Sequence, residues 1–60
     1  MEKKSLVICE DHPVVLQGLL SALTDHPAVV ISKTVQKGAD LLPVLHQINP
    51  DLLLLDLNLP

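Results

Sequence analysis

The chain of 60 residues contains no phenylalanine, tyrosine, tryptophan or arginine. Without aromatic rings it has no platform on which nucleic-acid bases could stack. Its basic residues are four lysines against seven acidic residues, which gives a net charge of −3. Because no basic stripe is present, the sequence indicates that this chain does not bind nucleic acid directly. Hydrophobic residues make up 48% of the chain, which excludes a disordered segment and predicts a core of aliphatic side chains.

Cysteine, glycine and long hydrophobic runs are also scarce. Cys9 has no partner for an intrachain disulfide, so we expect a buried, reduced thiol and a cytoplasmic location. Gly18 and Gly38 form neither a dinucleotide-binding nor a P-loop fingerprint. No apolar run approaches the roughly 20 residues that a membrane-spanning helix needs. The sequence therefore predicts no membrane segment.

The sequence does contain an alternation of apolar runs and helical patterns. The runs at 6–9, 28–31 and 51–57 are typical of strands, whereas residues 13–23 and 40–48 have helical spacing. The order strand, helix, strand, helix, strand predicts an α/β fold with right-handed βαβ crossovers and a parallel sheet. The four consecutive leucines of the third run predict a strand that is buried on both faces.

Prolines indicate where the two helices begin. Pro13 suits the first position of a helix, and Asp11 or His12 is placed to cap it. Pro43 is tolerable if the second helix begins near Asp40, because a first-turn amide has no partner within the helix.

Carboxylates follow two of the predicted strands. Glu10 and Asp11 follow the first strand, and Asp56 ends the leucine run of the third. If these strands are parallel neighbours, the three carboxylates converge, and they repel one another unless a cation lies among them. Mg²⁺ is the natural cation for oxygen ligands, and a metal-bound aspartate can attack phosphorus. The alternative is that all three are turn residues, with Asp11 capping the next helix.

The histidines have simpler interpretations. His12 is interpreted as a turn residue beside Pro13 rather than as a metal ligand or phosphodonor. His26 and His46 are expected on the surface, and the spacing of the histidines matches no zinc motif.

Two segments carry a resemblance to a known family. The sequences LVICEDHP at 6–13 and LLLLDLNLP at 52–60 strongly resemble two-component response-regulator receiver domains. The Asp-His-Pro turn and the Asn-Pro-Asp entry into the third strand are most similar to the NarL/FixJ-like branch. The resemblance implies the N-terminal half of a flavodoxin-like (βα)5 fold, a βαβαβ unit with sheet order 2-1-3. It implies that residues 1–60 are a truncated receiver domain without an output or DNA-binding domain.

The resemblance also implies roles for individual residues. Asp56 matches the phosphoacceptor, which takes a phosphoryl group from a sensor histidine kinase, so the chain is expected not to be an enzyme. Glu10, Asp11, Asp56 and the backbone carbonyl of Asn58 match the Mg²⁺ site, with Asp11 a direct ligand and Glu10 acting largely through water. Pro60 matches the proline of the following loop. The intact parent is expected to be a cytoplasmic response regulator that regulates transcription.

The sequence departs from the family in what it lacks. Receivers carry a Ser or Thr after the fourth strand and a Lys after the fifth, and Lys33 and Lys37 do not replace them on topological grounds. An alternative function is therefore a chemically silent half-receiver that self-associates. Its third strand would be an exposed apolar edge and would form a homodimer or a larger assembly. A magnesium phosphohydrolase of the haloacid-dehalogenase-like type fits poorly, because those enzymes have a second Asp where this chain has Asn58.

Overall fold

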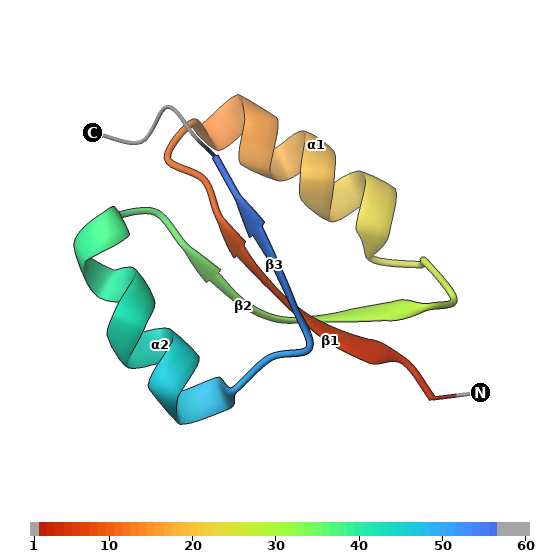
Figure 1. Ribbon diagram of the computed structural model, residues 1–60. Helices are drawn as coiled ribbons and strands as arrows, with labels where there is room; N and C mark the ends of the chain where they lie inside the picture. The colour runs from red at the N-terminus through yellow and green to blue at the C-terminus, as the bar shows by residue number, and fades with distance from the viewer. Residues whose placement is uncertain (1, 57–60) are drawn as a thin grey trace.

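A computed structural model of the chain describes residues 2–56. Its elements are, in order, β1 (Lys4–Cys9), α1 (Pro13–Leu23), β2 (Val29–Val35), the short 3₁₀ helix η1 (Gly38–Asp40), α2 (Leu41–Ile48) and β3 (Leu52–Leu55). The strands are parallel and lie in the order β2-β1-β3 (Figure 1). The predicted α/β fold, with its βαβαβ order and 2-1-3 sheet, is confirmed.

The two helices cover opposite faces of the sheet, and β1 lies between them (Figure 1). On one face, Leu6 and Ile8 of β1 pack with Leu16 of α1. On the other face, Val7 and Cys9 pack with the end of β2 and with α2. Because side chains alternate along a strand, this central strand contributes to both clusters. Burial on both faces is thus a property of β1.

The third strand is less buried than the sequence predicted. Leu52, Leu53 and Leu55 are exposed, with 46%, 40% and 43% of their surface accessible, and Leu54 packs against the α1 side. The expectation of a strand buried on both faces is wrong for β3 within residues 2–56. Among the described strands, β3 has a neighbour, β1, on one side only. The leucine run therefore predicted a strand correctly, but it did not reveal how much of that strand other elements bury.

The second strand is longer than predicted, because it contains a bulge. Leu6 of β1 pairs with Ile31, but the next residue, Val7, pairs with Lys33. Ser32 is therefore an extra residue between the two pairs, and a bulge of this kind bends and twists a strand without ending it. The polar residues after Ile31 lie on an edge strand, where exposed side chains are tolerated.

The helix boundaries follow the prolines. Pro13 is the first residue of α1 and His12 is its N-cap, but the described residues show no side-chain hydrogen bond that caps this helix. His12 therefore occupies the predicted N-cap position. The prediction that a side chain caps the helix by a hydrogen bond is wrong. Pro43 lies in the first turn of α2, where its missing N–H costs little. The part of the chain described by the structure has no helix that is long and apolar enough to cross a membrane.

The start of β3 is fixed to β1 at the end of the sheet opposite to the acidic residues. The carboxylate of Asp51 accepts a hydrogen bond from the backbone N–H of Ser5 at 2.8 Å and one from its hydroxyl at 3.3 Å. The backbone N–H of Asp51 donates in return to Ser5 Oγ at 3.0 Å. These bonds hold the pKa of Asp51 below its usual value, chiefly through the Ser5 backbone N–H.

Candidate metal and phosphoacceptor site

The backbone places two carboxylates at the carboxyl ends of neighbouring strands. The N–H of Glu10 donates to the carbonyl of Val35 at 2.9 Å, which continues the pairing of β1 with β2. The N–H of Asp56 donates to the carbonyl of Cys9 at 3.0 Å, which continues the pairing of β3 with β1. Sheet hydrogen bonds therefore fix the backbone under both residues, and neither depends on a loose loop for its position.

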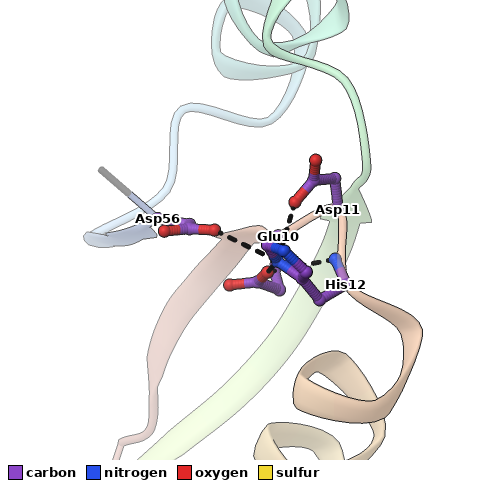
Figure 2. A group of neighbouring side chains, drawn as sticks. All are labelled: Glu10, Asp11, His12 and Asp56. Carbon is purple, nitrogen blue, oxygen red and sulfur yellow. Dashed lines mark hydrogen bonds and ion pairs between the residues drawn. The ribbon is translucent and has the colours of Figure 1, made fainter. Parts of the chain in front are cut away.

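Four side chains meet at this edge of the sheet. Glu10, Asp11, His12 and Asp56 each offer a ligand atom, and these atoms lie within 4.8 Å of one another (Figure 2). Glu10 is only 4% exposed, and the Asp56 and Asp11 side chains are 14% and 30% exposed. The three predicted carboxylates are thus brought together, with Glu10 buried and Asp11 and Asp56 partly exposed.

His12 lies among the carboxylates, which the sequence interpretation did not anticipate. Its Nδ1 atom is 2.6 Å from Glu10 Oε1, 2.9 Å from Asp11 Oδ1 and 3.5 Å from Asp56 Oδ2 (Figure 2). The hydrogen bond with Glu10 and the nearby negative charges raise the pKa of His12 above its ordinary value. The signal that could have revealed this role is its position, directly after the acidic pair and before the first residue of α1.

One carboxylate oxygen of the cluster is buried without a hydrogen bond. Asp11 Oδ1 has no hydrogen-bond partner among residues 2–56, although His12 Nδ1 is close to it. Nδ1 carries at most one proton, and Glu10 Oε1 is the nearer acceptor. A buried acceptor left in this state costs free energy that a bound cation would recover. The donor set of carboxylate oxygens fits Mg²⁺, which prefers oxygen ligands.

Comparison with known proteins agrees with this geometry. The family description "Response regulator receiver domain" matches residues 6–60. The chain belongs to this receiver domain family. Two curated relatives are the nitrate/nitrite response regulator proteins NarL of Escherichia coli strain K12 and of Escherichia coli O6:H1 strain CFT073. Each is 27% identical over 59 residues, which cover 98% of this chain.

These relatives support the NarL/FixJ-like branch of receivers that the sequence predicted. The chain spans about a quarter of their length, since the matched segment covers 27% of each. No solved structure gives a significant match.

The structure places some of the receiver residues and leaves others undescribed. Glu10, Asp11 and Asp56 lie together as the resemblance implies. Asn58 and Pro60, predicted to complete the metal site and to shape the next loop, lie outside the described residues.

The lysines and the other histidines of this receiver chain lie elsewhere. Lys33 and Lys37 line a separate cavity of about 430 Å³ beside β2. In the turn before β2, His26 Nδ1 accepts a hydrogen bond from the Ala28 N–H at 3.0 Å. His46 is exposed on α2, which agrees with the predicted surface position.

The thiol of Cys9 lies beneath the receiver site but is unsuited to chemistry. Cys9 is fully buried and forms no disulfide, as predicted. Burial raises the pKa of its thiol, and the negative charges of Glu10, Asp11 and Asp56 raise it further. Since the thiolate is the reactive form of cysteine, this environment keeps Cys9 inert, and its role is to fill the core on the α2 side.

Proposed function

We propose that this receiver domain accepts a phosphoryl group on Asp56, with Mg²⁺ held by Glu10, Asp11 and Asp56. The observation that carries the proposal is the meeting of these carboxylates at the carboxyl ends of β1 and β3, with Asp11 Oδ1 buried and lacking a hydrogen bond among the described residues. Bound Mg²⁺ would offset the negative charge of the incoming phosphoryl group. The backbone carbonyl of Asn58 is proposed as a further ligand.

The proposed chemistry is a single displacement at phosphorus. A carboxylate oxygen of Asp56 attacks, the bond between phosphorus and the donor breaks, and the donor leaves with the electron pair of that bond. The product is a mixed anhydride, the aspartyl phosphate. Each chain takes up one phosphoryl group, so the domain acts as an acceptor and not as an enzyme.

The family supports a phosphohistidine on a sensor histidine kinase as the donor. The NarL relatives are named as nitrate/nitrite response regulators, and we propose that this chain forms the receiver part of a regulator of transcription. The reduced, buried thiol of Cys9 is compatible with the cytoplasm, where such a kinase would act.

The proposal is tested by intact mass after incubation with Mg²⁺ and acetyl phosphate. The wild-type chain is expected to gain one phosphoryl group, and Asp56→Asn is expected to gain none. Asp40→Asn, which changes an exposed aspartate near the start of α2, is the matched control and should behave as the wild type. Circular dichroism establishes that each variant is folded. Equal labelling of Asp56→Asn and wild type, or no labelling of folded wild type, would contradict the proposal.

A second candidate function is supported by the exposure of β3. Three of its four leucines are exposed, and β3 is an edge of the sheet among the described strands. A chemically silent domain that pairs with a second copy through this strand, as a homodimer or larger assembly, would cover those leucines. The two functions differ in a simple way, because self-association needs neither Mg²⁺ nor Asp56.

A further inference from the structure

The imidazole of His12 is the one nitrogen ligand in the cluster of ligand atoms at the carboxyl end of the described sheet. We propose that His12 Nδ1 joins the carboxylates as a metal ligand, and that the site therefore binds first-row transition-metal ions such as Co²⁺ and Zn²⁺ more tightly than Mg²⁺. This inference rests on the same residues as the proposed function, but it concerns which ion they select and needs no phosphoryl transfer.

The distances around Nδ1 are close to those of a metal site. In a tetrahedral site with bonds of about 2.1 Å, neighbouring ligand atoms lie about 3.4 Å apart. Nδ1 is 2.6, 2.9 and 3.5 Å from oxygens of Glu10, Asp11 and Asp56 respectively. The separations from Glu10 and Asp11 each need to widen by less than an ångström, and rotation of the side chains allows this. Figure 2 shows the oxygens of all three residues directed at this nitrogen.

The backbone keeps the imidazole at the site. The backbone N–H of His12 donates to Glu10 Oε1 at 3.0 Å. Pro13, the residue after His12, is the first residue of α1. The backbone of residue 12 is therefore held beside the carboxylates, so that the imidazole needs only side-chain rotation to bind an ion. The histidine side chain is itself 59% exposed, which leaves a path by which an ion can enter.

The nitrogen donor decides the selectivity. Carboxylate and carbonyl oxygens suit Mg²⁺, Ca²⁺ and Mn²⁺, whereas imidazole suits Zn²⁺, Cu²⁺ and Ni²⁺. Mg²⁺ gains little from a nitrogen ligand and is reluctant to lose water. With His12 included, the site has one nitrogen and carboxylate oxygens, and the affinity order of divalent ions then favours the later transition metals.

The first experiment is metal binding to the full chain without a phosphodonor. Co²⁺ is titrated by its visible absorption, and Zn²⁺ and Mg²⁺ by calorimetry. We expect Co²⁺ to bind at least about 100-fold more tightly than Mg²⁺. The chain has no tyrosine or tryptophan, so a near-ultraviolet band from a cobalt–thiolate bond would be visible. No such band is expected, because the Cys9 thiol is buried.

The variants isolate the nitrogen ligand. Ser and Asn are both favourable N-cap residues, so His12→Ser and His12→Asn should leave α1 intact, and at least one folded variant is expected. Each should lose at least about tenfold in Co²⁺ affinity and much less in Mg²⁺ affinity. His46→Ser removes an exposed histidine from α2 and should bind as the wild type. An unchanged ratio of Co²⁺ to Mg²⁺ affinity in both His12 variants would overturn the proposal, as would an equal loss in His46→Ser.

A direct measurement on the wild type does not depend on the variants. In ¹⁵N nuclear magnetic resonance, one equivalent of Zn²⁺ should shift Nδ1 of His12 and leave His26 and His46 in place. Movement of His26 or His46 without His12 would contradict the proposal. Failure of Asp56 phosphorylation together with this shift would disprove only the proposed phosphoacceptor function. Phosphorylation without any His12 shift would disprove only the metal selectivity.

Discussion

Among single residues, the carboxylates of the site were predicted from the sequence and the histidine was not. Glu10 and Asp56 could be identified because each directly follows an apolar run, Asp11 is next to Glu10, and the ends of parallel strands meet at one edge of a sheet. His12 was interpreted as a turn residue, because its position directly after the acidic pair was not taken as a sign that its ring lies among the carboxylates. Its contact with Glu10 depends on an extended backbone at residue 12, with φ −90° and ψ 113°.

The ionisation of Asp51 should make the stability of the fold depend on pH. The pKa of Asp51 is lower in the folded chain than its ordinary value of 3.8, so its ionised form stabilises the fold above that value. This contribution is lost as the pH falls through the lower, folded pKa. Asp51→Asn should therefore lower the urea midpoint at pH 7 modestly, because the site is exposed, and the difference from wild type should shrink below about pH 4.

The matched control for this prediction is Asp25→Asn, which changes an exposed aspartate in the turn after α1. It should leave the midpoint close to that of the wild type. Circular dichroism in urea at pH 7 and pH 3 measures all three proteins. If the urea midpoints of Asp51→Asn and wild type differ by the same amount at both pH values, the negative charge of Asp51 does not contribute to the stability, which would contradict the prediction.

Among the elements, apolar runs identified the three strands and helical spacing identified α1 and α2, but η1 was not predicted and the environment of the edge strands was missed. β2 was predicted to end at residue 31 because Ser32, Lys33 and Thr34 are polar. The bulge at Ser32 and the open edge allow the strand to continue to Val35, which is buried. The leucines of β3 were predicted to be buried, but coverage depends on which elements lie beside a strand, and local sequence does not encode that.

The central strand should be the element most sensitive to a small loss of volume. Ile8 has no exposed surface and packs in the cluster with Leu6 and Leu16. Ile8→Val removes one methylene and should lower the free energy of unfolding by about 1 kcal/mol. Val14→Ala on α1, where the side chain is 82% exposed, should change it by less than about 0.5 kcal/mol. Urea unfolding followed by far-ultraviolet circular dichroism measures both, and equal effects would contradict the assignment of β1 as the core strand.

In the whole molecule, the carboxyl end of the sheet is acidic, and the edge strand β3 is apolar. The carboxyl ends of β1 and β3 hold the acidic cluster, and β3, which has β1 as its neighbour on one side only among the described strands, carries exposed leucines. The order of the strands could be predicted from the resemblance to receivers. The degree of exposure could not, because the sheet among the described residues has three strands and each face is only partly covered by one helix.

The exposed edge predicts self-association of this chain. Light scattering at micromolar concentration should give the mass of a homodimer or a larger assembly. Leu53→Lys, which places a charge on the edge strand, should shift the chain to the monomer. Val14→Lys, which adds the same charge on α1, is the control and should leave the mass unchanged. A folded wild-type monomer at this concentration would contradict the prediction.

Whether the carboxyl end of the sheet makes Asp56 a phosphoacceptor is decided by finding which residue carries the phosphoryl group. The chain is incubated with Mg²⁺ and acetyl phosphate, treated with borohydride, which reduces an acyl phosphate to an alcohol, and then digested for peptide mass analysis. Residue 56 alone should be converted to homoserine, and only when Mg²⁺ is present. Conversion at Glu10 or Asp11 in place of Asp56, or no conversion in a folded chain, would contradict it.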